Sequence, residues 1–319
     1  MAQQMGEVVV SRGQVRTWTS RWAETWKLIK ANRAAYLFTA PFLILFFTFT
    51  VLPVFAGVYL SFTYFNVLQP PKWIGWTNYR LLFLEDDIFL TAIKNTIIFS
   101  VITGPVGFIL SFILAWLINQ LKYRIVYTLA FYAPSITTAT AMAVIWRYFF
   151  SGDQYGFLNY LLIRLGILAQ PFQWLQDIDS ILPVIMIVAL WMSMGAGFLV
   201  FLAGLQNVDT QLYEAGKVDG IKNRWQEVYY ITLPLMKPQL LFGAVMAVVR
   251  SFEVGDISTS LAGFPSPLYA GHTILVHLMD YAFIRFEMGY AAAISVFLFC
   301  VMFGLSRLFM KVFSTRGEY

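Results

Sequence analysis

Long stretches without a charged residue are the feature that most constrains how this chain can fold. Five of them are free of Asp, Glu, Lys and Arg, and each is long enough for a membrane-spanning helix, which needs about 20 apolar residues. They are Ala34–Pro71, Asn95–Leu121, Ile125–Trp146, Ser180–Val208 and Met288–Ser306. A sixth span, about Leu235–Leu261, is interrupted by Arg250, Glu253 and Asp256. Because backbone polar groups must be paired internally in lipid, we predict an all-α polytopic membrane protein with six transmembrane helices.

The composition excludes several classes of protein. Charged residues make up only 12% of the 319 positions and hydrophobic residues 59%, whereas soluble proteins carry about 25% charged residues. The single cysteine, Cys300, rules out an intramolecular disulfide. His272 and His277 have no cysteine nearby, so their spacing does not indicate a metal site. The chain also contains no nucleotide-binding P-loop, HExxH or Gly-x-Ser-x-Gly motif, and we expect neither an enzyme nor a bound metal or cofactor.

The basic residues indicate the orientation of the spans. Of the 22 Lys and Arg residues, 15 fall in alternate segments that include both chain ends and the polar segment 209–238. Cytoplasmic loops carry such an excess, so we expect these segments on the cytoplasmic side. The net charge of +5 therefore reflects membrane topology and does not indicate a nucleic-acid partner.

Three segments follow from this topology. Residues 1–33 form a basic cytoplasmic tail in which Trp18, Trp22 and Trp26 recur every four residues, either as a helix lying on lipid headgroups or as a disordered tail. Residues 34–315 form the six-helix transmembrane domain, and residues 316–319 are a cytoplasmic end.

The polar segment 213–238 reads YEAGKVDGIKNRWQEVYYITLPLMKP and predicts two short helices joined by a turn. Gly220 can adopt the positive φ of a sharp reversal. Asn223 and Gln226 have the spacing of a capping box that opens a second helix. On that helix we expect Lys222 and Glu227 to be solvated.

The spacing of a few residues in this segment closely resembles the EAA loop of permease subunits in carbohydrate ABC importers. The residues that carry the resemblance are Glu214, Ala215, Gly216, Asp219, Gly220, Leu233 and Pro234. The stretches 39–62 and 132–159 also look like spans of such permeases, so the resemblance covers about residues 34–315. Two departures are Gly216 in place of a second alanine and one extra residue between Gly220 and Ile231.

This resemblance implies a subunit of a larger assembly in the bacterial cytoplasmic membrane. Glu214 and Gly220 would insert into the cleft of a separate ATPase, and ATP with Mg²⁺ would be bound by two such partner subunits. Similarity to the larger membrane subunit of the maltose transporter implies a second, dissimilar permease subunit. An extracytoplasmic sugar-binding protein would deliver the cargo.

Ionisable residues inside a span are costly, and they commonly mark a transport path. Arg250, Glu253 and Asp256 share one stripe of a continuous helix, where Arg250 and Glu253 either form a structural pair or line the path. Resemblance places further residues along the path. They are Met192, Ser193, Ala196 and Ser251, with Trp191 beside them.

The arginine in this set indicates an anionic cargo, because a guanidinium matches a carboxylate in a bidentate manner. We therefore expect an oligosaccharide that contains uronic acid. The alternatives are an ABC permease for a solute other than a sugar, and a secondary transporter.

Overall fold

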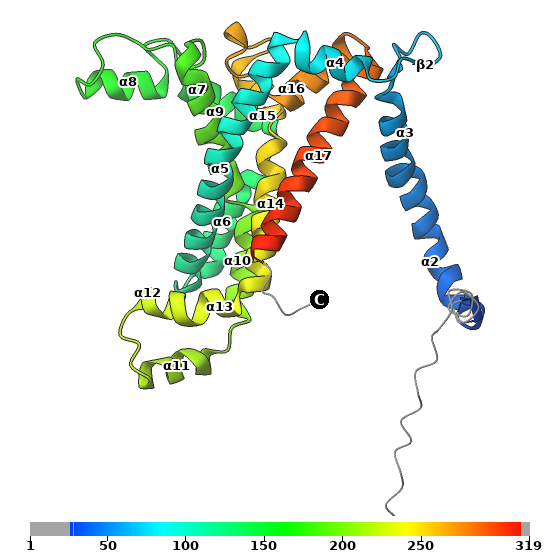
Figure 1. The fold of residues 1–319 in the computed structure, drawn as a ribbon. Coiled ribbons are helices and arrows are strands. Elements are labelled where there is room, and N and C mark those ends of the chain that lie inside the picture. Colours follow the sequence, from blue (N-terminus) through cyan, green and yellow to red (C-terminus); the bar gives the residue numbers. More distant parts are fainter. Residues whose placement is uncertain (1–25, 28, 314–319) are drawn as a thin grey trace, which may run out of the picture. The chain divides into compact units, whose positions relative to one another are not determined.

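The computed structural model describes residues 26, 27 and 29–313, and the regular elements of this part of the chain are helices apart from one short hairpin (Figure 1). The α-helices are α2 (Arg33–Phe46), α3 (Leu52–Leu60), α4 (Thr77–Leu84), α5 (Asp87–Asn119), α6 (Arg124–Ile136), α7 (Ala139–Phe149), α8 (Phe157–Arg164), α9 (Ile178–Ser193), α10 (Ala196–Gln206), α11 (Thr210–Val218), α12 (Arg224–Glu227), α13 (Leu233–Leu235), α14 (Lys237–Phe252), α15 (Asp256–Ala262), α16 (Ile274–Met279) and α17 (Met288–Phe313). The shorter elements are the π-helical turns η1 (Phe47–Val51), η2 (Val228–Thr232) and η4 (Asp280–Ile284), the 3₁₀ turn η3 (Pro267–Tyr269), and the antiparallel strands β1 (Thr63–Tyr64) and β2 (Lys72–Trp73). Residues 1–25 and 28 of the predicted tail, with Trp18 and Trp22, and the end 316–319 lie outside the described residues.

The chain divides into two compact units, residues 1–56 and 57–319. In the described part of the first unit, α2 and η1 run without a break into α3, and no residue of α2 is buried. This helical run, Arg33–Leu60, is 28 residues long and apolar enough to cross a membrane.

The described residues contain four helical runs that can cross a membrane, or six when each of two sharply bent pairs is counted as one span. The four runs are Arg33–Leu60, Asp87–Asn119, Ile178–Gln206 and Met288–Lys311. The pairs are Arg124–Ile136 with Thr140–Phe149, bent by 100°, and Arg224–Leu235 with Lys237–Phe252, bent by 83°. The predicted all-α membrane architecture is confirmed.

The third predicted span is two helices rather than one. α6 contains Pro134, which lacks an N–H, and ends two residues later at Ile136. Thr137 is extended, and the Thr138 side chain accepts a hydrogen bond from the Ala141 N–H, which caps a new helix, α7. Breaking the helix and capping its continuation produce the bend of 100°.

The fifth predicted span is shorter than expected, and the continuous stripe of Arg250, Glu253 and Asp256 is wrong. α14 ends at Phe252, the backbone leaves the helix at residues 253–255, and Asp256 begins the separate helix α15. Arg250 lies in the last turn of α14, where its positive charge is favourable beside free carbonyl groups. Ending the helix there places the ionisable residues at an end and not in mid-span.

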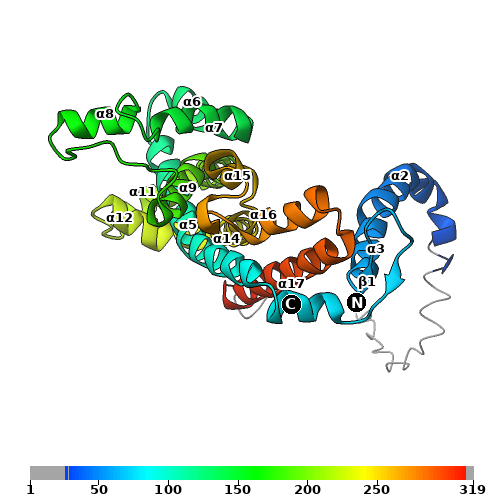
Figure 2. The ribbon, with the colours of Figure 1, turned by 90° about the horizontal axis from the view of Figure 1, so that it is seen from above.

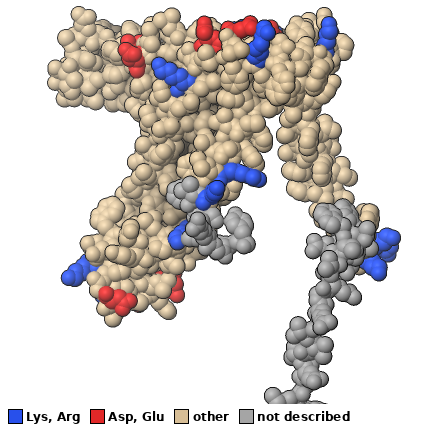
Figure 3. All heavy atoms as spheres, viewed as in Figure 1, with Lys and Arg blue, Asp and Glu red and all other residues tan. Residues whose placement is uncertain are grey.

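In the unit 57–319, α5 is the central helix and packs against α9, α10 and α14, while α14 also packs against α10 and α17 (Figures 1 and 2). α11, α12 and α13 lie at one end, which we call the α11 end, and the last turns of α17 lie near the same end. α4, α7, α8 and α16 lie at the opposite α8 end. On the face seen in Figure 3, charged side chains gather toward these two ends and leave an apolar band between them, as a bilayer requires.

Close helix contacts in this unit depend on glycine. A Cβ atom on Gly243 of α14 would overlap the ring of Phe201 in α10, and Phe201 is 1% exposed. A Cβ on Gly107 of α5 would lie 3.0 Å from Ser193 Oγ of α9. These glycines allow α14 and α5 to approach their neighbours closely, as small residues do between membrane helices.

Candidate functional site

The segment at the α11 end folds as two helices joined by a turn, as predicted. Gly220 has φ of +96°, which favours glycine. Asn223 Oδ1 accepts from the Gln226 N–H at 2.9 Å. Gln226 Oε1 accepts in return from the Lys222 N–H at 2.8 Å, so the reciprocal bond reaches one residue further back than in the usual capping box.

α11 packs on the second helix through Gly216. This glycine is buried, and a Cβ on it would lie 2.7 Å from Ile231 Cδ1 and 3.0 Å from Ile221 Cδ1. Tyr213 Oη and Thr232 Oγ1, 3.0 Å apart, join the same two helices. The glycine at the position of the expected alanine is therefore matched by two isoleucines that fill its space.

The opposite face of this segment is open. Glu214, Ala215, Asp219 and Gly220 are exposed, Pro234 is exposed in α13, and Leu233 is half-buried. Exposed apolar groups accompany them, with Val218 at 88% and Trp225 and Tyr229 each at 67% exposure. An exposed set of this kind is typical of a surface that binds another protein.

The expectation that Glu227 is solvated is wrong. Its side chain is buried, and Oε2 accepts from Arg224 Nη1 at 2.9 Å. Arg224 lies one turn earlier on α12, so the two side chains reach each other at the i, i+3 spacing. The ion pair offsets part of the cost of burying the carboxylate.

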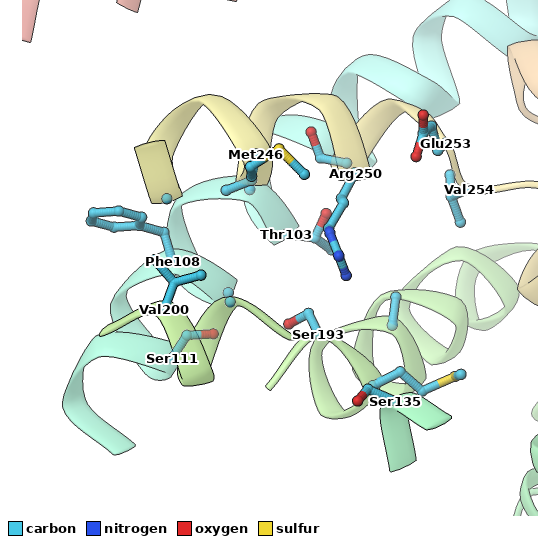
Figure 4. A pocket seen from close by; sticks show the side chains of 18 of the residues that line it. Thr103, Phe108, Ser111, Ser135, Ser193, Val200, Met246, Arg250, Glu253 and Val254 are labelled. Atoms are coloured by element: carbon cyan, nitrogen blue, oxygen red, sulfur yellow. The ribbon is translucent and has the colours of Figure 1, made fainter. Parts of the chain in front are cut away.

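A central cavity of about 520 Å³ lies between α5, α9, α10 and α14 (Figure 4). Such a volume is typical of a small-molecule site. Five small hydroxyl residues line it together with glycines and apolar side chains. They are Thr103 and Ser111 of α5, Ser135 of α6, Ser193 of α9 and Ser251 of α14.

Most of these hydroxyls donate to carbonyl groups of their own helices. Ser193 donates to Leu190 O at 2.8 Å, and Ser251 donates to Val248 O at 2.7 Å. Each hydroxyl oxygen can still accept a hydrogen bond. The walls can therefore accept hydrogen bonds from the hydroxyl groups of a ligand without losing their internal bonds.

Arg250 supplies the positive charge of the cavity. Figure 4 shows its guanidinium reaching from α14 into the cavity, with Ser193 and Ser135 on the wall opposite. No ion pair or hydrogen bond of this guanidinium occurs among the described residues. Glu253 lines the same cavity, and the described structure contains no ion pair between Glu253 and Arg250.

The other predicted path residues are only partly brought together. Met192, Ser193 and Ser251 line the cavity with Arg250 and Glu253. Trp191 does not, because its ring packs edge-on against Trp146 with centroids 5.4 Å apart. Ala196 begins α10, and its side chain lies outside the described part of the structure.

Sequence reasoning missed the contribution of α5 and α6. Thr103, Ser111 and Ser135 are isolated small polar residues in charge-free stretches, and Met246 lies one turn before Arg250 on α14. The available signal was the recurrence of serine and threonine within spans, which also occurs wherever membrane helices pack. Only the three-dimensional structure distinguishes the serine and threonine residues that line the cavity from those that merely allow helices to pack.

Comparison with known proteins identifies the class of this chain. No family model matches it. It is 36% identical over 285 residues to the probable ABC transporter permease protein YesP of Bacillus subtilis (strain 168), which covers 88% of this chain and 90% of that protein. It is 31% identical over 303 residues to the arabinooligosaccharides transport system permease protein AraP of the same strain, covering 94% of each. The chain belongs to the permeases of binding-protein-dependent carbohydrate ABC transporters.

The permease also matches a solved structure along nearly its whole length. The crystal structure of a bacterial ABC transporter involved in the import of the acidic polysaccharide alginate aligns with a TM-score of 0.78 and 25% identity, over 92% of this chain and 100% of that chain. The permease is therefore a multi-pass membrane protein with this transporter fold, and permeases of this class do not themselves hydrolyse ATP.

Proposed function

We propose that this permease passes an oligosaccharide containing uronic acid through the central cavity. The observation that carries the proposal is the guanidinium of Arg250, which has no ion pair or hydrogen bond among the described residues and shares a cavity of about 520 Å³ with five small hydroxyl residues. Arg250 is exposed to the cavity in this chain, so its guanidinium is free to bind a carboxylate of the cargo in a bidentate manner. The hydroxyl walls suit the remaining ring hydroxyls. Similarity to an alginate importer supports an acidic sugar.

The assembly around the permease follows from its class and from its exposed α11 end. The complete transporter would contain two ATP-binding subunits, which hold ATP and Mg²⁺, and one of them would bind the exposed residues Glu214, Ala215, Asp219 and Gly220 of this chain. A second permease subunit would complete the path, and an extracytoplasmic sugar-binding protein would deliver the cargo. The α11 end and both termini would then face the cytoplasm of a bacterium. A complex of the alginate transporter with a substrate-loaded periplasmic protein supports this arrangement.

The experiment that tests the cargo compares uptake of two sugars by Arg250→Gln. In proteoliposomes with the complete transporter, uptake of a trimer of galacturonic acid should fall about tenfold, which corresponds to about 1.4 kcal/mol. Uptake of a neutral xylotriose should change little. Arg307→Gln is the matched control, because Arg307 lies over the Phe303 ring in α17, away from the cavity. Equal losses for the two sugars would remove the case for an acidic cargo.

A second candidate is a neutral oligosaccharide. Glu253 brings an acidic group to the same cavity, and AraP is named for neutral sugars. In that case Arg250→Gln depresses xylotriose uptake as strongly as trigalacturonate uptake. The role of the α11 end is tested separately, because Glu214→Arg should abolish stimulation of ATP hydrolysis by the loaded receptor for either sugar.

A further inference from the structure

A second cavity, of about 570 Å³, lies at the α8 end of the molecule. It is formed by the end of α7, the segment before α9 and the loop after α15, three regions brought together because α15 packs against both α7 and α9 (Figure 2). Its polar lining consists mainly of one arginine, two amides and a hydroxyl. These residues are Arg147, Gln173, Gln176 and Ser151.

Arg147 brings an uncompensated charge to this cavity. It is exposed in the last turn of α7, and the described residues offer it no ion pair or hydrogen bond. The nearest carboxylates in the sequence are engaged elsewhere. Asp153 accepts from Ser151 Oγ and from the Tyr155 N–H, and Asp177 accepts from the Ser180 N–H.

The amides are placed to contact a ligand beside this charge. Gln173 is fixed by its Nε2, which donates to the Gly152 carbonyl at 3.0 Å, and its Oε1 has no bonding partner in the described chain. The Gln176 side chain is exposed, and it forms no hydrogen bond within the part of the chain that the structure describes. Amides that can donate and accept suit sugar hydroxyls, and the volume falls within the usual range of a small-molecule site.

The second cavity and the central cavity are separated by one buried hydrophobic cluster. Phe99 and Val254 belong to this cluster and line the central cavity. Phe150 and Leu261 belong to the same cluster and line the second cavity. Each cavity therefore has an arginine that forms no ion pair among the described residues, and members of one apolar cluster line both cavities.

We propose that the second cavity is an entry subsite for the acidic sugar, in which Arg147 binds a carboxylate before the sugar reaches Arg250. This inference rests on the proposed function, since it assumes the same cargo. In this arrangement Phe99, Phe150, Val254 and Leu261 form the barrier that must part for the sugar to pass. A guanidinium on each side of the barrier lets the carboxylate exchange one cation for another, which limits the cost of moving a charge past apolar groups.

Binding of sugar in the entry subsite can be measured by thiol labelling, without an uptake assay. In the complete transporter carrying Cys300→Ser, Gln176→Cys places a thiol in the second cavity for a membrane-impermeant maleimide. At a trigalacturonate concentration about ten times its dissociation constant, labelling should slow about tenfold, because the fraction of free sites falls by that factor. Xylotriose should not slow it. ATP and receptor are omitted, so the reading does not depend on uptake.

Further variants test whether the protection by trigalacturonate depends on Arg147. Arg147→Gln should abolish protection, Arg147→Lys should restore part of it, and Arg164→Gln should leave it intact, because Arg164 lies on α8 and bonds to Tyr160. Normal yield of the assembled complex with each variant shows that folding is preserved. Protection that survives Arg147→Gln, or equal protection by xylotriose, would each overturn the proposal.

The outcomes also separate this inference from the proposed function. If Arg250→Gln depresses trigalacturonate uptake selectively while no protection occurs at Gln176→Cys, the entry subsite is wrong and the cargo stands. If protection depends on Arg147 while Arg250→Gln affects both sugars equally, the entry subsite stands and the role of Arg250 is wrong. If the thiol of Gln176→Cys is labelled more slowly without added sugar than the thiol of the double variant Gln176→Cys, Arg147→Gln in the same lipids, Arg147 would instead be assigned to binding lipid phosphate.

Discussion

Trp116 of α5 and Trp225 of α12 pack together with ring centroids 5.2 Å apart and an angle of 35° between their planes. This pair joins the segment at the α11 end to the helix that also contributes Thr103 and Ser111 to the central cavity. A displacement of α12 therefore has a direct aromatic contact through which it can move α5.

We expect Trp225→Leu to reduce sugar uptake per ATP hydrolysed by up to about tenfold, because aromatic pairs contribute about 0.5–1.5 kcal/mol. Basal ATP hydrolysis should be retained. The measurement is the ratio of uptake to hydrolysis in proteoliposomes. Tyr229→Leu is the matched control, since Tyr229 is equally exposed, at 67%, and its one aromatic ring pair among the described residues is with the neighbouring Tyr230.

A double-mutant cycle tests whether the two rings act as one unit. Trp116→Leu should give the same loss as Trp225→Leu, and the double variant should lose no more than either. Additive losses would show that the two tryptophans act independently.

Gly216 and Ile231 should show compensating effects. Gly216→Ala places a Cβ 2.7 Å from Ile231 Cδ1 and should destabilise the segment by about 1 kcal/mol, as overpacking does. Ile231→Val removes that methyl group and should restore the melting temperature of the assembled complex in the double variant. A double variant as unstable as Gly216→Ala would place the strain at Ile221 instead.

The crossing of α10 and α14 should not tolerate a methyl group at Gly243. Gly243→Ala forces the Phe201 ring or the helix backbone to move, at a cost of about 1–3 kcal/mol, whereas Gly304→Ala in α17 meets no atom within 4 Å. Thermal unfolding of the purified complex measures the stability of both variants. Equal melting temperatures for the two variants would contradict the close contact.

A buried histidine pair at the α8 end should make the stability of the complex depend on pH. His272 Nε2 lies 3.1 Å from His277 Nδ1, and His277 Nε2 lies 3.0 Å from Asp86 Oδ2. Burial lowers the pKa of His272 from 6.5 to about 4, with the nearby His277 adding to the effect and Asp280 opposing it. Burial raises the pKa of Asp86, but hydrogen bonds from His277 and the Phe89 N–H outweigh this and hold it below its ordinary value.

The direction in which stability changes with pH follows from the lowered pKa of His272. Between pH 6.5 and about 4 the unfolded chain takes up a proton on this histidine that the folded chain does not, so stability should fall as pH falls through that window. Asp86 remains ionised there. His272→Gln removes the titrating group and should flatten the dependence of melting temperature on pH. An unchanged slope in His272→Gln would assign the loss to other groups.

The apolar stretches predicted the helices well, because the cost of unpaired backbone groups in lipid leaves few other structures for them. The bends could not be predicted in the same way. Pro134 is compatible with a mild kink in a membrane helix, and the bend of 100° depends on the cap that Thr138 provides for the next helix. Hydropathy is equal on both sides of such a break.

The candidate site was predictable where a residue was unusual for its surroundings and not where it was ordinary. Arg250 is a charge in an apolar stretch, so its role as a lining residue could be anticipated. Ser111 and Ser135 are common in membrane helices, and only the fold places them in the same cavity. Glu227 was misjudged because its burial depends on how α12 packs, which the local pattern does not contain.

The bend of 83° beside Met236 sets α12 and α13 almost at right angles to α14. Met236 is 1% exposed and packs in the same buried cluster as Phe201 and Leu202, so this joint is held at its centre. α12 and α13 thus form a short arm and α14 a long arm, and the joint between them at Met236 is held in the protein interior. We therefore expect a push on α12 and α13 along the membrane surface to tilt α14, whose last turn carries Arg250.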